Sequence, residues 1–173
     1  LKGDIFMDIR LAEEKDLDQM MEIIRETVKE MHKNDNFQWD SEYPNREVFL
    51  NDIKNKSLYV VVEDDIVGGF AVFNFEYPDS YSALPWKSKN KDYVIHRLAV
   101  DVNQRKNGIA KLLMEFGEKL ALEENMAYIK TDTNSKNIKA RKFFENMGYE
   151  YIGKMHLPGI EDEFYCYEKE LNK

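Results

Sequence analysis

Apolar residues recur near the start of the chain at the spacing of a helix. They stand three or four positions apart between residues 17 and 31, at Leu17, Met20, Met21, Ile24, Val28 and Met31. This spacing places them on one helical face and predicts an amphipathic helix. Asp16 stands at the N-cap position, and residues 7–12 before it are expected to form a short strand.

An irregular stretch over residues 34–45 separates this helix from a second one of about ten residues. The second helix is expected to bury Val48, Phe49 and Ile53. Residues 58–63 form a β-branched run, Asp64 and Asp65 a turn, and residues 66–75 another apolar run. Two such runs around a short polar turn predict an antiparallel hairpin.

The second half of the chain alternates strand and helix patterns after a long polar loop at 76–92. Loops of this length in compact domains are often functional. The expected strands are 93–100, 127–133, 149–156 and 163–171, and the expected helices are 108–124 and 138–147. This order predicts one α/β or α+β domain with a mixed sheet.

Composition narrows the class of protein. The chain has 173 residues, a net charge of −8 and one cysteine, Cys166. One domain over residues 7–173 is expected, with residues 1–6 as a remnant of the expression vector, because a reading frame can begin at Met7. No apolar run approaches the roughly 18 residues that span a bilayer, and the acidic charge disfavours general nucleic-acid binding.

The lone cysteine excludes an internal disulfide and a cysteine-based metal cluster. It fits a reducing, cytoplasmic location. We expect Cys166 to be a small buried hydrophobic residue and not a nucleophile. The three histidines, His32, His96 and His156, lack ligand spacing, so no metal is expected.

The segment from Val100 to Leu113 carries the most chemical information. A strand ends there, a short turn follows, and a helix begins near Gly108. Free backbone N–H groups at a helix start bind anions, phosphate above all, and Arg105 and Lys106 add positive charge. The glycine alone is explained equally well by a solvated turn. The P-loop and dinucleotide-binding patterns are absent.

Two motifs carry a resemblance to a known family. Residues 105–110, Arg-Lys-Asn-Gly-Ile-Ala, resemble the Arg/Gln-x-x-Gly-x-Gly/Ala signature of the GNAT superfamily of acetyl-CoA-dependent N-acetyltransferases. Residues 137–149 resemble its second motif, Asn-x-x-Ala-x-x-x-Tyr-x-x-x-Gly-Phe. The resemblance implies a mixed, mostly antiparallel sheet that is flanked by helices and splayed between strands 4 and 5. It also implies acetyl-CoA (coenzyme A) as cofactor.

The resemblance assigns roles to particular residues. A bulged strand would pair with the pantetheine arm, and a backbone N–H near Leu98 or Ala99 would face the thioester oxygen. The reaction implied is direct attack of a neutral primary amine on the thioester, which makes Leu98 a catalytic candidate. The cofactor-binding candidates are Leu98, Ala99, Val100, Arg105, Lys106, Asn107, Gly108, Ile109, Ala110, Lys111, Asn137 and Phe144.

Two positions depart from the family pattern. Lys106 stands where glycine is common, and its backbone N–H can still donate. Phe144 stands where a tyrosine often protonates the leaving thiolate, so that proton comes from solvent or from Tyr149, or is not needed. A thiolate is already a tolerable leaving group at a thiol pKa near 8.5.

The general base is open at this stage. Some family members carry a carboxylate early in the fourth strand, where this chain has Val94. His96 lies two residues further and has a suitable ordinary pKa, although a purely structural strand histidine is the slightly better interpretation. Asp132, Glu76 and a chain of waters are alternatives.

Aromatic residues mark the acceptor side. Trp39 and Tyr43 lie between the first two helices, and Tyr81 and Trp86 lie in the long loop. Aromatic faces suit a cationic amine, of a small molecule or of a peptide, but the same residues could simply cover the core edge. The resemblance makes a homodimer plausible.

Two further functions stay open. The chain could hold acetyl-CoA as a catalytically weak sensor, which Phe144 would allow. It could instead be a structural partner domain that uses its aromatic face for protein contacts.

Overall fold

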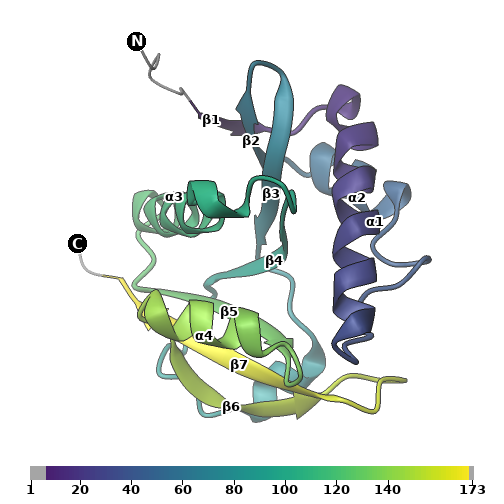
Figure 1. Ribbon diagram of the computed structural model, residues 1–173. Helices are drawn as coiled ribbons and strands as arrows, with labels where there is room; N and C mark the ends of the chain where they lie inside the picture. The colour runs from purple at the N-terminus through teal and green to yellow at the C-terminus, as the bar shows by residue number, and fades with distance from the viewer. Residues whose placement is uncertain (1–6, 172–173) are drawn as a thin grey trace.

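The computed structural model describes residues 7–171, so the expected vector remnant at residues 1–6 lies outside the described part. Strands and helices follow one another as in Figure 1. The strands are β1 (Asp8–Leu11), β2 (Leu58–Glu63), β3 (Ile66–Asn74), β4 (Tyr93–Val100), β5 (Tyr128–Asn134), β6 (Glu150–His156) and β7 (Glu163–Glu170). The α-helices are α1 (Leu17–Lys33), α2 (Arg46–Lys54), α3 (Ile109–Glu123) and α4 (Ile138–Asn146). Short 3₁₀ helices are η1 (Glu14–Asp16), η2 (Asp79–Ala83) and η3 (Arg105–Asn107).

The strands form one mixed sheet in the order β1-β2-β3-β4-β5-β7-β6. Every neighbouring pair is antiparallel except β4 and β5, which are parallel. The sequence-based expectation of a mostly antiparallel mixed sheet flanked by helices is therefore confirmed.

The parallel pair is short, and this opens the sheet. Only three residue pairs join β4 to β5, and the last of them is Ile95 with Thr131. Both strands continue beyond that point, β4 to Val100 and β5 to Asn134, without pairing to each other. The two strands part there in Figure 1, which confirms the splay expected between strands 4 and 5.

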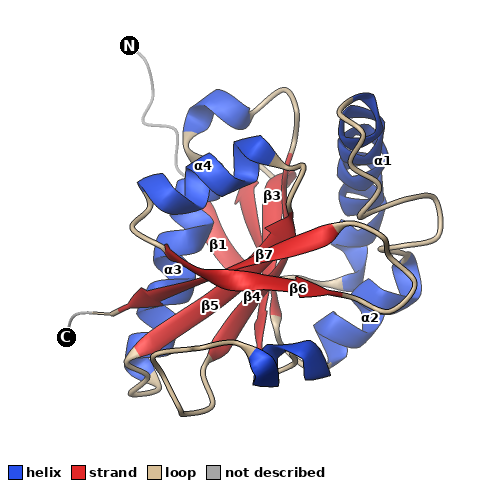
Figure 2. Cartoon of the chain, turned by 90° about the horizontal axis from the view of Figure 1, so that it is seen from below, coloured by secondary structure: helices blue, strands red, loops and turns tan. Residues whose placement is uncertain are grey.

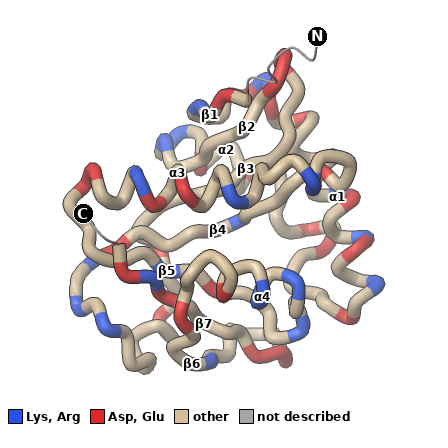
Figure 3. Tube along the Cα trace, turned by 60° about the vertical axis from the view of Figure 1, so that its left-hand side comes forward, with Lys and Arg blue, Asp and Glu red and all other residues tan. Residues whose placement is uncertain are grey.

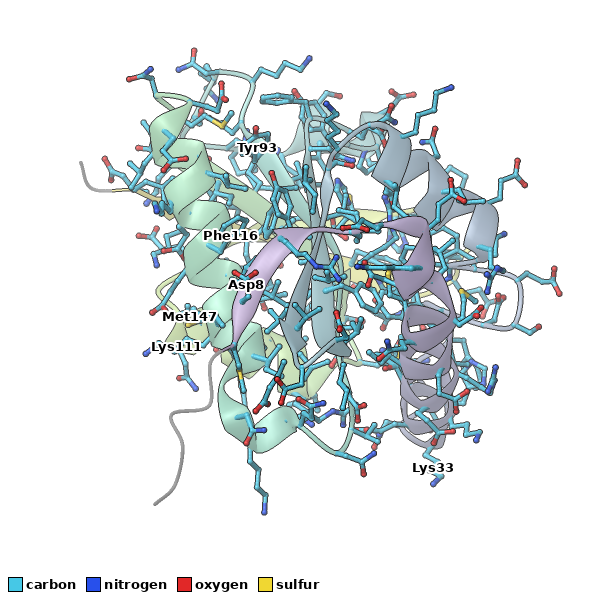
Figure 4. The ribbon with its side chains drawn as sticks, turned by 90° about the horizontal axis from the view of Figure 1, so that it is seen from above. Asp8, Lys33, Tyr93, Lys111, Phe116 and Met147 are labelled. Carbon is cyan, nitrogen blue, oxygen red and sulfur yellow. The ribbon has the colours of Figure 1, made fainter. Side chains whose placement is uncertain are left out.

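Helices cover both faces of the sheet. Seen from below, α1 and α2 lie on one side, and α3 and α4 lie on the other (Figure 2). Figure 4 looks from above, with α3, which carries Lys111 and Phe116, opposite α1, which ends at Lys33. Each face of the sheet has its own core. On one face, α1 and α2 pack on β2 and β3 around Phe49 and Phe70. On the other face, α3 packs on the sheet through Leu113.

The loop between β3 and β4 is fastened to the far end of the sheet. Its Tyr81 and Trp86 are buried in a third cluster with Phe164 and Cys166 of β7. The buried carboxylate of Glu168 accepts the backbone N–H groups of Lys87 and Ser88 at 3.0 and 3.1 Å. The long polar loop at residues 76–92 is thus an ordered segment beside the region where β4 and β5 separate.

Element boundaries agree with the sequence pattern to within about two residues, but one local role differs. Asp16 lies in η1, and its side chain makes no helix-capping bond to α1. It instead accepts two hydrogen bonds from Arg10 and one from the backbone N–H of Glu13. Asp16 therefore occupies the N-cap position of α1 as expected, but its side chain does not cap the helix, because Arg10 and the N–H of Glu13 hold its carboxylate.

Within residues 7–171, no helix is long and apolar enough to cross a membrane. In the same range, no group of three or more His, Cys, Asp or Glu side chains is placed to hold a metal ion.

Helix α3 can approach the sheet closely because Gly117 faces Phe73. A Cβ at Gly117 would lie 2.2 Å from Cε1 of the Phe73 ring. We expect Gly117→Ala to lower the free energy of unfolding by about 1–2 kcal/mol, because the overlap outweighs the better helix propensity of alanine. Urea denaturation measures this, with Lys119→Ala on the exposed face of α3 as the control that leaves stability unchanged. Unaltered stability in Gly117→Ala would contradict the close packing.

Candidate active site

A cleft of about 1080 Å³ lies where β4 and β5 separate. Its walls come from the free ends of both strands, the start of α3, one face of α4, the end of α1, single residues of β6 and β7, and the segments that connect these elements. Backbone groups on the facing edges of two separated strands have no partner in the sheet and remain available to a ligand.

The cleft edge of β4 carries a β-bulge. Arg97 and Leu98 together oppose the single residue Ala71 of β3, and Arg97 has a φ of 47°. A bulge turns the backbone locally and leaves ladder groups unpaired. It also turns Arg97 to the α2 side of the sheet, which it would not face if the strand alternated regularly.

A buried ion pair fixes this bulge. Arg97 donates from Nε and Nη2 to both oxygens of Asp52 on α2, at 2.9 and 2.7 Å. Its Nη1 donates to the hydroxyl of Tyr43 at 3.0 Å. The side chains of Arg97 and Asp52 are 11% and 3% exposed. A left-handed conformation is strained for arginine, so the two-pronged contact holds the backbone where it would not otherwise stay.

The loop before α3 forms the basic end of the cleft. Gly108 has a φ of 75°, and a Cβ there would meet no atom within 4 Å. The first turn of α3 follows, with backbone N–H groups that lack partners within the helix. Arg105 and Lys139 both reach Glu30 of α1, so this carboxylate links the starts of α3 and α4 across the cleft.

Helix α4 forms the wall opposite β4. Its N-cap is Asn137, whose side-chain oxygen accepts the N–H of Ala140 at 3.1 Å. Asn137 also lines the cleft. Phe144 is 5% exposed and packs against Tyr149 and Tyr167, so it supplies an apolar surface and no proton.

Two titratable groups with shifted pKa values, His96 and Asp132, line the cleft. His96 Nε2 lies 2.7 Å from the backbone oxygen of Glu76, and because a carbonyl only accepts, this nitrogen carries the hydrogen. Burial, helped by the neighbouring charge of Arg97, lowers the pKa of His96 to about 4. Burial raises the pKa of Asp132 to about 6, although the hydroxyl of Tyr81, which donates to it, opposes the rise.

Loops enclose the end of the cleft that is remote from Gly108. Trp39 is held by its backbone oxygen, which lies 2.8 Å from His32 Nε2. The side-chain oxygen of Gln38 accepts the backbone N–H of Asn134 at 3.2 Å, which joins the α1–α2 loop to the end of β5.

The cleft gathers most of the residues that the sequence singled out. Those that line it are Trp39, Tyr43, His96, Leu98, Ala99, Val100, Arg105, Gly108, Ala110, Lys111, Asn137 and Phe144, together with the alternative base Asp132. Six others do not line it, the five that follow and Tyr149. Lys106 and Asn107 are exposed, Ile109 is buried under α3, and Tyr81 and Trp86 are buried in the third cluster.

Tyr149, the alternative proton donor, lies away from the cleft. Its hydroxyl donates to Glu118 of α3 at 3.2 Å, beside Lys169, and its pKa is raised well above the usual value by burial. Tyr149 is therefore corrected from a site residue to a core residue. The alternation of Tyr165 and Tyr167 against Cys166 along β7 is as expected, with Cys166 fully buried.

Sequence reasoning missed Arg97 and Asp52. Each interrupts an otherwise apolar pattern, Arg97 within the strand 93–100 and Asp52 next to Ile53 on the buried side of α2. Two opposite charges at positions that should be buried are a signal for a buried pair, but the pattern could not say that they meet.

Comparison with known proteins gives the family. The profile described as "Acetyltransferase (GNAT) family" matches residues 19–149, which is more than half of the chain. The chain belongs to the GNAT family of acetyltransferases. The family uses acetyl-CoA, so this GNAT chain is an acyltransferase by family.

Solved structures agree with the GNAT assignment. A GNAT-family acetyltransferase from Streptococcus agalactiae 2603 is 29% identical, with 96% of each chain covered and a TM-score of 0.82. A putative acetyltransferase from Staphylococcus aureus Mu50 is 30% identical over 95% of this chain and 99% of the other, with a TM-score of 0.73. The Salmonella typhimurium protein YncA, a putative acetyltransferase solved with acetyl-CoA, shares the fold at 15% identity, 96% and 95% coverage and a TM-score of 0.69. Among curated protein sequences, no match was found.

The residues of this GNAT chain fit an acyl-CoA cofactor. The unpaired edges of β4 and β5 can hydrogen-bond an extended amide-bearing arm, as a strand would. The open space at Gly108 and the basic groups of Arg105 and Lys111 suit phosphates. Figure 3 shows Lys and Arg interspersed with Asp and Glu along the trace, so the basic end of the cleft is a local feature.

The ion pair at the bulge can be tested directly. We expect Asp52→Asn to lower the free energy of unfolding by about 3–5 kcal/mol, because it leaves the charge of Arg97 buried without its partner. The matched control is Asp18→Asn, which breaks the exposed pair of Asp18 with Arg46 and is expected to change stability little. Equal effects of the two variants, measured by urea denaturation, would show that the buried pair does not hold the bulge.

Proposed function

We propose that the chain is an N-acetyltransferase that moves the acetyl group of acetyl-CoA to a primary amine by direct attack on the thioester. One observation carries this proposal. Asp132, with a pKa raised to about 6, lies in the same cleft as the bulged edge of β4 and the open loop at Gly108. A site for a phosphate-bearing cofactor and a poised base thus share one cavity.

The cofactor would be held along the splay. The N–H groups at the start of α3, with Arg105 and Lys111, would bind its phosphates, and the edge of β4 from Leu98 to Val100 would bind its amides. Asn137 and Phe144 would form the opposite wall. When bound, the cofactor supplies an acetyl group activated as a thioester.

Asp132 is the base that we propose. As the amide forms, an N–C bond replaces the C–S bond, and the amine nitrogen gives up a proton. An ionised Asp132 would take this proton, and the leaving thiolate would gain one from solvent or from protonated Asp132. The hydroxyl of Tyr81 holds the carboxylate in place and limits how far its pKa rises.

His96 is the weaker candidate for the same role. With a pKa of about 4 it is about 100-fold less basic than Asp132, and its Nε2 is committed to Glu76. If His96→Ala changes turnover at pH 7 by less than about threefold, histidine is not the base, because a base is worth roughly 10²–10⁴-fold.

Two measurements test the function. Calorimetry reports acetyl-CoA binding, and thiol release over a panel of amines reports transfer. Binding without release from any amine would favour the sensor function, for which Phe144 is the supporting observation. Failure to bind acetyl-CoA at millimolar concentration would overturn both, and would leave the structural partner domain.

Gly108 allows a sharp test of cofactor binding. We expect Gly108→Ala to weaken acetyl-CoA binding at least tenfold, because the left-handed conformation disfavours a Cβ and the first turn of α3 shifts. Gly159→Ala is a matched control, since Gly159 has a similar φ of 77° and equally open surroundings but lies in the β6–β7 loop. Equal affinity of both variants, measured by calorimetry, would remove the α3 start from the cofactor site.

The pH dependence of transfer identifies the base. Because Asp132 acts in its ionised form, we expect kcat/KM to rise with pH through about 6 and Asp132→Asn to lower kcat at least 100-fold. Tyr81→Phe removes the hydrogen bond that lowers the pKa of Asp132, so the rising limb should move to higher pH. A limb near pH 4, or one that stays in place in Tyr81→Phe, would contradict this assignment.

A further inference from the structure

The charges that line the cleft are almost all compensated within the protein. The charged or titratable residues among them are Glu30, His96, Arg97, Arg105, Lys111, Asp132, Lys136 and Lys139. Each basic Lys or Arg of this set lies within 4 Å of a carboxylate, and Glu30 pairs with two of them. Of the cleft-lining carboxylates in residues 7–171, only Asp132 forms no ion pair; its recorded hydrogen bond comes from the Tyr81 hydroxyl.

The surroundings of Asp132 are apolar. In the sheet it stands opposite Cys166, and Phe164 lies two residues further along β7 on the same face. Phe164 pairs with Met155 of β6, and both are buried residues that line the cleft. Leu157 and Ile160 of the β6–β7 loop continue this apolar surface toward solvent.

We propose that the acceptor is a small monoamine with an apolar body, whose ammonium group pairs with Asp132 while its body packs on Met155, Leu157, Ile160 and Phe164. This inference rests on the proposed acetyl transfer and names its substrate class. An unpaired carboxylate in apolar surroundings is costly, and a cation brought by the substrate removes that cost. Before the attack the ammonium gives one proton to Asp132, which releases it to solvent, so that the nitrogen is a neutral amine and Asp132 is ionised again when the N–C bond forms.

The same surface disfavours other amines. A substrate carboxylate would need a free cation, but Arg97 and Lys136 are held by Asp52 and Asp162. A second ammonium would need a second free carboxylate, and Asp162 also accepts from Asn134. Amino acids and diamines should therefore be poor substrates.

The acceptor end is also closed in by mutually fastened loops. Gln38 ties the α1–α2 loop to Asn134 of β5, and Ser80 ties the β3–β4 loop to the backbone oxygen of His156 on β6, at 3.0 Å. A pocket bounded in this way suits a small molecule better than a segment of polypeptide.

Two matched pairs of amines test the substrate class by thiol release with saturating acetyl-CoA. 2-Phenylethylamine and phenylalanine differ by a carboxylate, and hexylamine and 1,6-diaminohexane differ by a second amine. We expect kcat/KM to be at least tenfold higher for the first member of each pair, and higher than for a tripeptide with a free N-terminus. If phenylalanine, the diamine or the tripeptide is acetylated as well as the monoamines, the substrate class is wrong although acetyl transfer stands.

Direct binding and a specificity change complete the test. Calorimetry of 2-phenylethylamine with the CoA-saturated protein should show at least tenfold weaker binding in Asp132→Asn and no change in Glu161→Gln, which alters an exposed carboxylate of the β6–β7 loop. Ile160→Glu adds a second carboxylate and should raise the ratio of diamine to hexylamine turnover about tenfold. Unchanged binding in Asp132→Asn would overturn the inference, whereas release from no amine at all would overturn the acetyl transfer on which it rests.

Discussion

The structure depends on the early end of pairing between β4 and β5. Three residue pairs join the two halves of the sheet, and the core under α3 continues across this junction, from Phe73 of β3 and Ile95 of β4 to Ile129 of β5. Beyond Ile95 and Thr131 the facing strand edges cannot satisfy each other, and buried backbone groups need partners. The fold therefore contains an unsatisfied site at its centre, which a ligand with amide groups can complete.

A strand edge is useful to a ligand only if it keeps its shape, and the pair of Arg97 with Asp52 provides this. The bulge places a non-glycine residue at positive φ, which is unfavourable by itself. One edge of its guanidinium donates to Asp52 of α2, and its remaining nitrogen, Nη1, donates to Tyr43 of the α1–α2 loop. Movement of α2 or of the Tyr43 loop would therefore displace the backbone next to Leu98, so the proposed acceptor loop and the proposed cofactor-binding edge of β4 are coupled through Arg97.

The sequence predicted the fold better than the chemistry, for a physical reason. The periodicity of apolar residues and the turn residues are local features, so the helices, the strands and the glycine turn before α3 could be predicted from nearby positions. Asp52 and Arg97 lie 45 residues apart, and Asp132 and Tyr81 lie 51 apart. Their contacts arise only when the sheet is assembled, as does the separation of Tyr149 from the cleft. The pKa values of His96 and Asp132 follow from burial, which no single stretch of sequence reveals.

The two carboxylates that line the cleft differ in their surroundings: Glu30 is paired with two cations, and Asp132 is paired with none among the described residues. This difference distinguishes the two ends of the cleft. Glu30 lies between Arg105 and Lys139, so a phosphate that binds these groups must compete with a carboxylate already present. Asp132 forms no ion pair within residues 7–171, and burial raises its pKa to about 6. At one end of the cleft, a phosphate of the proposed cofactor would therefore replace the Glu30 carboxylate as the partner of Arg105 and Lys139. At the other end Asp132 has no cationic partner in the described part of the chain, and the proposed substrate would supply one. The two ends of the cleft thus differ in charge before either ligand binds, and each suits a different ligand.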